Sequence, residues 1–495
     1  MIRILVCTGL LAASLCARAQ SYPTMASAPD PADFASRADF RMTLAGDPFR
    51  FGGADLDWLG GVAAGAPGAP SRLPTTYEAE DGVLAVHAMG GTVIRAPSLV
   101  SSVDCPICLE VTRGRFNAAA FAALDHILHF AHDNGIRLIL PLVGPLGADC
   151  AHTDPAEGAR GDGCAYLARR GLRDRSAFFS DPGVRADVAA HAAALLDHVN
   201  AETGARYRDD PAILAWEDCD ACAAGADPKT VRAWSDAFAS FVKARDKRHL
   251  FETGAFAGHL DALLADPPKS DGPIDIVGDR LLDPNRTGSG EVAWTTAPKI
   301  GKAGFVYVVD AMGWNATYWK SLDELSASLS IGIQTPELTG ALLWRLYAHA
   351  DEGGLMPDFT RTGPDAFLFP GVGNGTVSWG DMRERARLFR RFSYIMAGVS
   401  TAPMFEAPPL PVIISVHAGR ITWRGSAGAI AYDIQRSPDP GKDGSWETVC
   451  HSCGADPAST WQDPSPLKSR AWYRMTPFNM NNHAGAPSDP VQDSG

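Results

Sequence analysis

The feature that most constrains the fold is an alternation of short apolar runs with longer amphipathic runs from residue 49 to residue 399. The apolar run IRLILPLV (136–143) has the length and composition of a strand buried on both faces. The run just before it, 117–135, carries apolar residues at the i, i+3, i+4 and i+7 positions of an amphipathic helix. About eight such units predict a (β/α)8 barrel of the TIM type, an α/β fold.

The other units have clear boundaries. The helix predicted within 181–204 has Asp181 as its N-cap and Pro182 at its first position. Further strands are predicted within 49–59, 212–219, 250–255, 274–282, 303–314 and 340–350, and further helices within 228–249 and 381–398.

The barrel is predicted to occupy residues 48–403 and to be followed by a second domain. Residues 404–411 end in APPLP, a stiff run typical of a linker. Beyond it, within 412–495, short alternating strands are separated by Gly, Pro, Asp and Ser, which predicts a small all-β sandwich. Residues 20–47, rich in Pro, Ala and Ser, are predicted to form an extension lying over the surface.

Residues 1–19 have the layout of a secretory signal peptide. Arg3 supplies positive charge, residues 4–16 form a short apolar core, and residues 17–19 (ARA) form a small-x-small cleavage site. Cleavage there predicts a secreted or periplasmic protein, with a lipoprotein anchored through Cys16 as an alternative. No later stretch has the length of apolar sequence that a membrane span needs.

The net charge and the motifs of the sequence limit the classes of binding partner that can be expected. The 495 residues carry a formal net charge of -13, which disfavours nucleic acid and anionic membranes and favours a neutral partner. We find no Gly-rich phosphate loop between a strand and a helix, so the sequence predicts no nucleotide and no other cofactor. It does not predict an oligomeric state.

Eight cysteines remain after the predicted cleavage, and they fall in local pairs. An even number in an exported protein favours disulfides. Three pairs have C-x-x-C spacing, so a four-thiolate zinc site built from the first and third pairs is an alternative. The pairs are Cys105/Cys108, Cys150/Cys164, Cys219/Cys222 and Cys450/Cys453.

Several stretches together resemble a known family. RYRDDPAILAWE (206–217) and the helix before it are similar to the segment that precedes the acid/base in endo-β-1,4-mannanases of glycoside hydrolase family 5, the plant and fungal type. FGGADLDWL, TVIRA and ALLWRLYAHADEGG resemble that family's first, second and eighth strands. The tail from residue 421 is similar to the fibronectin type III-like domain of some bacterial relatives.

The resemblance implies retaining glycosidase chemistry, which needs two carboxyl groups about 5–5.5 Å apart. The family's acid/base Glu falls on Ala221, and its nucleophile Glu falls on Ala311. The Asn beside the acid/base falls on Asp220, while a supporting His and Tyr fall on Arg280 and Leu282. Alanine can neither donate a proton nor attack, so the sequence predicts that this chemistry is lost.

Asp220 and Asp310 are the carboxylates nearest the substituted positions, and they are the candidate catalytic residues if activity persists. Side chains alternate along a strand, so Asp310 is predicted to point away from the cleft if Ala311 points into it. Glu217 is expected either to contact substrate or to have a structural role at the strand end.

Aromatic rings near strand ends are candidate sugar platforms, because the C–H face of a pyranose packs on an aromatic ring. The candidate substrate-binding residues are Asp55, Trp58, Arg95, Glu217, Arg280, Trp314, Trp344 and His349. The leading interpretation is an exported protein that binds a β-linked, mannan-type polysaccharide or oligosaccharide without cleaving it. The alternatives are a hydrolase that uses Asp220 and Asp310, and thiol or metal chemistry at the C-x-x-C turns.

Overall fold

The computed structural model describes residues 33–62, 71–146, 150, 163–223, 225–282, 294–314, 318–356, 367–371, 378–442, 444–454, 460–467 and 470–495. The predicted signal peptide, residues 1–19, lies outside the described residues. Within the described ranges, no helix combines the length and the hydropathy that crossing a membrane requires.

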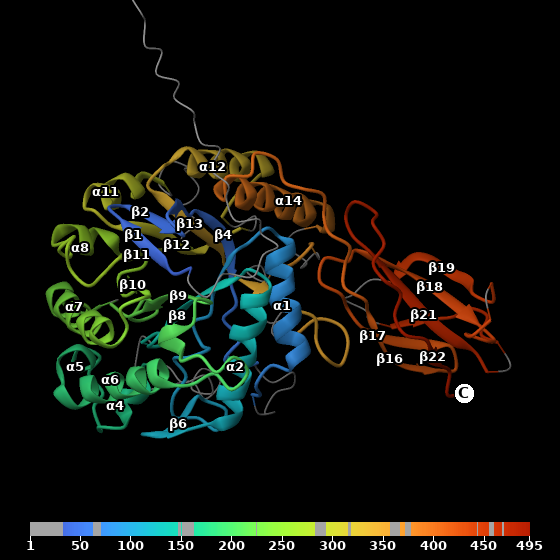
Figure 1. The fold of residues 1–495 in the computed structure, drawn as a ribbon, viewed down its shortest axis with the longest axis horizontal. Coiled ribbons are helices and arrows are strands. Elements are labelled where there is room, and N and C mark those ends of the chain that lie inside the picture. The colour runs from blue at the N-terminus through green and yellow to red at the C-terminus, as the bar shows by residue number, and fades with distance from the viewer. Residues whose placement is uncertain are drawn as a thin grey trace, which may run out of the picture.

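A closed barrel of eight parallel strands forms the larger domain, as predicted (Figure 1). Around the barrel the strand order is β10-β11-β12-β13-β4-β5-β8-β9. The bounds are β4 Phe51–Asp55, β5 Val93–Arg95, β8 Arg137–Pro141, β9 Ile213–Glu217, β10 Leu250–Thr253, β11 Ile276–Leu281, β12 Val306–Met312 and β13 Leu338–Leu343.

Helices surround the barrel, and side-chain caps set the starts of several. Asp181 accepts bonds from the amides of Gly183 and Val184 and so caps α6, which confirms the predicted start. The helices are α1 Thr76–Ala88, α2 Ala118–Asp133, α4 Cys164–Ala168, α5 Ser176–Ser180, α6 Pro182–Asp197, α7 Pro228–Arg245, α8 Leu260–Ala265, α11 Ala297–Lys302, α12 Leu322–Gln334 and α14 Trp379–Met396, with the 3-10 turn η1 at Tyr207–Asp209.

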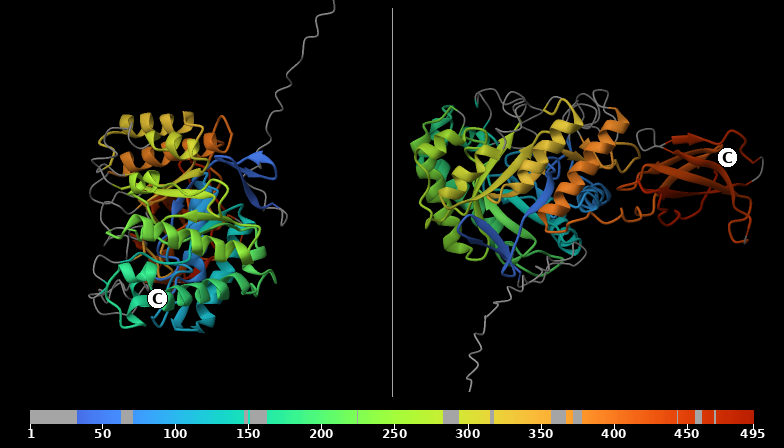
Figure 2. Two further views of the ribbon diagram at one scale, coloured as in Figure 1. Left: turned by 90° about the vertical axis from the view of Figure 1, so that its left-hand side faces the viewer. Right: turned by 90° about the horizontal axis from the view of Figure 1, so that it is seen from above.

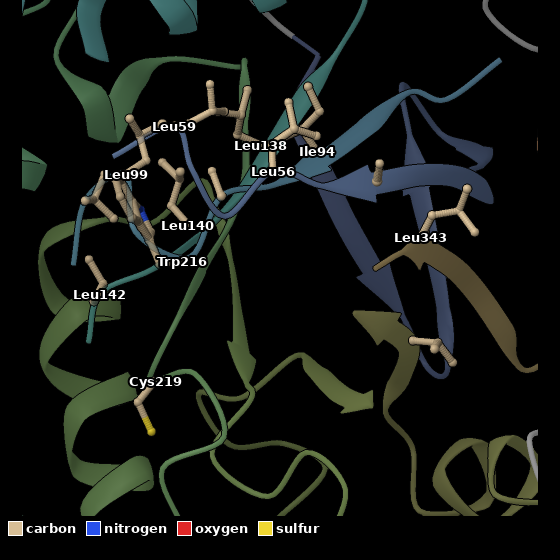
Figure 3. Close-up of a cluster of buried hydrophobic side chains, with 14 of the residues drawn as sticks. Leu56, Leu59, Ile94, Leu99, Leu138, Leu140, Leu142, Trp216, Cys219 and Leu343 are labelled. Carbon is tan, nitrogen blue, oxygen red and sulfur yellow. The ribbon is translucent and has the colours of Figure 1, made fainter. Parts of the chain in front are cut away.

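Alternation along the strands divides the core into two clusters. One face of each strand packs against the helices, as Leu138, Leu140 and Trp216 do in Figure 3. The opposite face fills the barrel interior, and all eight strands contribute to that second cluster, including Phe51 and Val93. The interior is therefore packed with side chains rather than open.

The N-terminal extension does more than lie over the surface. Its described part forms an antiparallel sheet of β1 Ala35–Ala38, β2 Arg41–Leu44 and β3 Asp47–Pro48. Met42 and Leu44 are buried in the same cluster as the interior residues that begin the barrel strands. Their burial corrects the surface prediction for this segment, because two apolar side chains at i and i+2 point together into the barrel floor.

The C-terminal domain consists of two antiparallel sheets, β16-β17-β20 and β19-β18-β21-β22, as a small sandwich requires. Trp423, Tyr432 and Tyr473 fill the space between them. The strands are β16 Val412–His417, β17 Arg420–Arg424, β18 Ala431–Ser437, β19 Glu447–Gly454, β20 Thr460–Gln462, β21 Trp472–Phe478 and β22 Val491–Gln492. Shorter pairs elsewhere are β6 Glu110–Thr112 with β7 Arg115–Phe116, and β14 Leu346–Tyr347 with β15 Phe367–Leu368.

The sandwich lies beside the barrel, next to α1 (Figures 1 and 2). Tyr77 of α1 donates to the carbonyl of Gly425 at 2.9 Å, and Arg424 pairs with Asp351 at 2.6 Å. Arg390 of α14 donates to the carbonyl of Pro403 at the end of the barrel domain. The first two of these contacts fix the sandwich against the barrel.

Candidate functional site

The carboxyl ends of the barrel strands bring together a buried network of ionisable groups, at the end where barrels of this type place their sites. Arg95, the last residue of β5, lies at its centre and is 1% exposed. It donates twice to Glu217, at 2.7 and 2.8 Å, and once to Asp55, at 2.9 Å. The bidentate geometry suits a planar guanidinium and holds Glu217 in one orientation.

Asp220 is held between two guanidinium groups. It accepts from Arg95 at 2.6 Å and from Arg280 of β11. Burial alone would raise the pKa of Asp220, but Arg280 and Arg95 overcome this effect and lower the pKa to about 2. Asp220 is therefore ionised at neutral pH and has no proton to donate as a general acid.

Glu252 and Asp310 form a second carboxylate group beside this network. A Cβ at Gly278 would lie 2.0 Å from Oδ2 of Asp310 and 2.5 Å from Oε1 of Glu252, so the two carboxyls share a space that only glycine leaves open. All four of their carboxyl oxygens are buried, and none has a hydrogen-bond partner among the described residues. Two carboxylates this close repel each other, which favours a proton on one of them.

Asp310 is predicted to point away from the cleft if Ala311 points into it, and the structure shows why strict alternation is not a guide here. Alternation does hold along β12 as far as Asp310: Val306 and Val308 face the barrel interior, so the next inward residue is Asp310. The pairing then shifts, with Val309 opposite Asp279 and Ala311 opposite Arg280. Asp310 is the extra residue of this bulge, so the alternation that the conditional prediction assumed does not continue from Asp310 to Ala311.

Burial raises the pKa values of four further carboxyls in the network. Burial is the main cause for Glu217, whose pKa rises to about 8 although Arg95 opposes the rise. It raises the pKa of Asp310 to about 6, and that of Glu252 well above its usual range, where the charges of Asp310 and Glu217 add to it. Burial likewise raises the pKa of Asp55 well above its usual range.

Ala221 and Ala311 bring no chemistry of their own. Ala221 lies in the turn after β9 with a φ of 50°, and Ala311 is fully buried in β12. Asp218, between Glu217 and the turn, accepts from the amides of Gly254 and Ala255 at 3.0 and 3.2 Å. It fixes the loop after β10, which is a structural role.

Two of the predicted sugar platforms are core residues. Trp58 is fully buried and donates through its indole nitrogen to the carbonyl of Leu346 at 2.8 Å. Trp314 is 2% exposed and packs on Phe367 with ring centroids 5.0 Å apart. The prediction of sugar contact is wrong for both rings, because neither has an accessible face. Trp344, which directly follows β13, is half-buried and is the remaining candidate.

His349 also has another role. Its Nδ1 lies 2.9 Å from Asp81 of α1, and a Cβ at Gly425 would lie 2.2 Å from its ring. It is buried where the barrel meets the sandwich, which corrects its prediction as a substrate contact.

Cysteine pairing decides between the predictions for the four local pairs. All four are disulfide-bonded, as predicted, so these pairs leave no thiolate for the zinc site, and that alternative is wrong. Four disulfides are consistent with an oxidising extracellular compartment. The bonded pairs are Cys105–Cys108, Cys150–Cys164, Cys219–Cys222 and Cys450–Cys453.

The fourth pair lies outside the barrel site. Cys450 and Cys453 both belong to β19 of the sandwich. Cys450 pairs with Ile434 and Gly454 with Tyr432, so the residues between them bulge out of the strand, and Cys453 lies in this bulge. The sulfur of Cys453 lies 3.9 Å from the carbonyl oxygen of Tyr432. It has no proton to donate there, because it is bonded to Cys450, and its role is structural.

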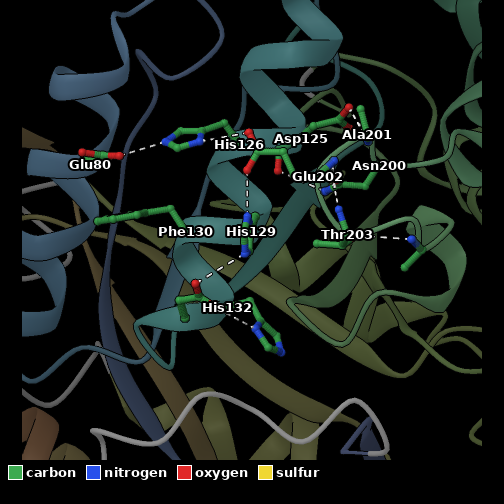
Figure 4. Close-up of polar contacts among 12 residues, drawn as sticks. Glu80, Asp125, His126, His129, Phe130, His132, Asn200, Ala201, Glu202 and Thr203 are labelled. Carbon is green, nitrogen blue, oxygen red and sulfur yellow. Dashed lines mark hydrogen bonds and ion pairs between the residues drawn. The ribbon is translucent and has the colours of Figure 1, made fainter.

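A separate histidine cluster lies on the outer face of α2 (Figure 4). His126 and His129 both contact Glu202, at 3.1 and 2.7 Å, and His126 also contacts Glu80 of α1 at 3.0 Å. Within the described ranges, no group of three or more His, Cys, Asp or Glu is arranged to hold a metal ion. The cluster ties α1, α2 and the loop after α6 together.

Sequence reasoning missed two members of the site, Glu252 and Arg345. Glu252 stands in the buried strand LFET, where an acidic residue needs a partner, and that was an available signal. Arg345 follows Trp344 directly, and its guanidinium lies 5.2 Å from the Trp344 ring centroid.

Comparisons with known proteins agree with this architecture. A family described as GH family 5 beta-mannosidase-like matches residues 170–269. A rice mannan endo-1,4-beta-mannosidase 2 (Oryza sativa subsp. japonica) is 31% identical over 45% of this chain and 47% of its own length. A tomato mannan endo-1,4-beta-mannosidase 1 (Solanum lycopersicum) is 30% identical over 46% and 53%. The chain thus spans about half the length of the curated relatives it matches.

Solved structures share the fold at low identity. An endo-beta-1,4-mannanase from Thermotoga petrophila aligns over 90% of this chain and 97% of its own, with a TM-score of 0.56 and 15% identity. An endo-1,4-beta-mannanase from Rhizomucor miehei aligns over 72% and 99%, with a TM-score of 0.53 and 15% identity. The likeness to these structures shows the fold, a (β/α)8 barrel. In sequence, the chain is similar to family 5 beta-mannosidase-like proteins over residues 170–269 and to plant mannan endo-1,4-beta-mannosidases over about half of their length.

Proposed function

We propose that this protein is exported, and that it binds a β-1,4-linked, mannan-type oligosaccharide or polysaccharide at the carboxyl end of its barrel without hydrolysing it. The relatives that match are named as mannan endo-1,4-beta-mannosidases, which supports the glycan class. The signal-like residues 1–19 and the four disulfides support export.

The observation that carries the loss of hydrolysis is the state of Asp220. It is the carboxylate nearest the acid/base position, and Arg95 and Arg280 hold it ionised with a pKa of about 2. A general acid must be protonated at the working pH, so Asp220 cannot replace the missing glutamate. Ala311 supplies no nucleophile, and Asp310 is engaged with Glu252.

Arg280 reinforces this conclusion. Hydrolysis by this class of enzyme passes through an oxocarbenium-like transition state, which a nearby fixed cation disfavours. A guanidinium is nevertheless a good partner for a bound ligand, because it presents five N–H donors. The site is therefore better suited to holding a saccharide than to cleaving one.

Trp344 provides the test of binding. Calorimetric titration with mannohexaose is expected to give saturable binding, and Trp344→Ala is expected to weaken it about 30-fold, since a central aromatic contact contributes roughly 2 kcal/mol. Trp446→Ala, in the sandwich domain, is the matched control and should leave the affinity unchanged. Equal affinity for the Trp344 variant and the wild type would remove the barrel mouth from the binding site.

One observation favours a second candidate function, hydrolysis with Asp310 as a catalytic carboxylate. Asp310 faces the barrel interior, and burial raises its pKa to about 6, which is in the range that an acid/base residue needs. Under this alternative, mannohexaose is shortened by the wild type and left intact by Asp310→Asn. Intact hexaose with both proteins excludes it.

A further inference from the structure

Two arginines flank the partly exposed aromatic ring at the barrel mouth. The guanidinium carbons of Arg280 and Arg345 lie 5.8 and 5.2 Å from the ring centroid of Trp344. Their side chains are 22% and 17% exposed, whereas Arg95 beneath them is 1% exposed. A ligand that approaches Trp344 therefore meets these two cations before it meets the buried network.

Each of the two guanidinium groups retains donors for a ligand. Arg280 pairs with Asp220 through Nη2, and Arg345 pairs with Asp57 through Nη1. Among the described residues, the Nε of each has no hydrogen-bond partner, but both Nε atoms are buried, so a ligand meets the other, partly exposed part of each guanidinium. Every guanidinium has five N–H donors in a planar fork, so each arginine has further N–H groups besides the one that its ion pair uses.

Negative charge lies deeper than positive charge at this mouth. The side chains of Asp220 and Asp57 are only 6% and 10% exposed, and those of Asp55 and Glu217 are fully buried. Burial also raises the pKa of Glu217 to about 8, which reduces the negative charge of the network near neutral pH. The outer layer therefore favours an anionic group on the ligand.

We propose that the saccharide bound here carries carboxylate groups, and that Arg280 and Arg345 recognise a β-1,4-linked uronic acid oligosaccharide whose ring packs on Trp344. This inference rests on the proposed glycan-binding function and specifies the ligand class. A carboxylate at C6 of the sugar matches the bidentate fork of a guanidinium, which the hydroxymethyl group of a neutral hexose does not.

The test compares two hexasaccharides that differ in their C6 groups, β-1,4-linked mannohexaose and β-1,4-linked hexamannuronate. Calorimetric titration at pH 7 is expected to show the mannuronate bound at least tenfold more tightly in 50 mM salt. The preference should shrink at 300 mM salt, because part of it comes from attraction between charges. Arg345→Gln should weaken mannuronate binding about tenfold more than it weakens mannohexaose binding.

The control is Arg387→Gln on α14, whose exposed guanidinium pairs with Glu384 far along the chain from the mouth. It should leave both affinities unchanged. If Arg345→Gln fails to fold because Asp57 loses its partner, the double variant Asp57→Asn/Arg345→Gln replaces it. Mannohexaose bound as tightly as the mannuronate, or a preference that survives in the Arg345 variant, overturns the inference and leaves the binding function standing. No binding of either saccharide contradicts both.

Discussion

Replacing Arg95 by methionine removes the cation at the centre of the buried network while keeping much of its volume. Asp55 and Glu217 would then be buried with no positive partner, since both depend on this guanidinium. Removing one partner of a buried ion pair typically costs about 3–5 kcal/mol. A barrel of roughly 350 residues has an unfolding entropy of about 0.7 kcal/mol/K, so this loss corresponds to a decrease in Tm of about 4–7 °C.

The loss of stability caused by Arg95→Met should be larger at high pH than at low pH. Burial already raises the pKa of Asp55 and Glu217, and removing the opposing charge of Arg95 raises both further. When a carboxyl has a higher pKa in the folded than in the unfolded protein, the folded protein loses stability as the pH rises from the unfolded to the folded pKa. Arg95→Met should therefore be least destabilised near pH 5 and most destabilised near pH 8.

Differential scanning calorimetry at pH 5 and pH 8 measures both the decrease in Tm and its dependence on pH. Arg387→Met is the control, because Arg387 makes only an exposed pair with Glu384, and its Tm should stay within about 1 °C of the wild type. A decrease of less than about 1 °C for Arg95→Met at pH 8, or an equal decrease at both pH values, would refute the reasoning that Arg95 compensates buried carboxylates.

Three further predictions address the neighbouring features. Because the folded pKa values of Asp310 (about 6) and Glu252 are raised, the wild type should lose stability as the pH rises from about 4 through 6; Glu252→Gln should flatten the Tm profile, and an unchanged slope contradicts the coupling of the two carboxyls. Cys219→Ser/Cys222→Ser should lower the free energy of unfolding in urea by about 2 kcal/mol, as expected for so short a disulfide loop, and no change would mean that the disulfide does not constrain the turn. Arg390 donates to the carbonyls of Pro403 and Met404, so Arg390→Met should speed proteolytic cleavage within 404–411, while exposed Arg391→Met should not; equal rates would show that the contact does not hold the linker.

The barrel was predictable because local patterns and global fold agree. The apolar run 136–143 predicts a buried strand from its local sequence alone. The residues Asp181 and Pro182 likewise predict the capped start of α6 without information from the rest of the chain. The two sheets of the C-terminal domain followed from alternating strands in the same way.

The site was less predictable because it depends on strand phase and on long-range pairing. The direction of Asp310 follows from which residues of β12 face the interior and from a bulge opposite β11, neither of which is visible in a single sequence. Trp58 and Trp314 stand near strand ends as expected, but packing against distant segments buries them. The apolar pair Met42 and Leu44 closes the barrel floor for the same long-range reason.

The central claim is that the barrel mouth binds a β-linked saccharide and leaves it intact. One sample tests it: the wild-type protein is titrated calorimetrically with mannohexaose, held for a day at saturation, and then analysed by chromatography for shorter products. The account predicts saturable heat of binding and recovery of unchanged hexaose. Release of mannobiose or mannotriose, lost in Asp310→Asn, would contradict it.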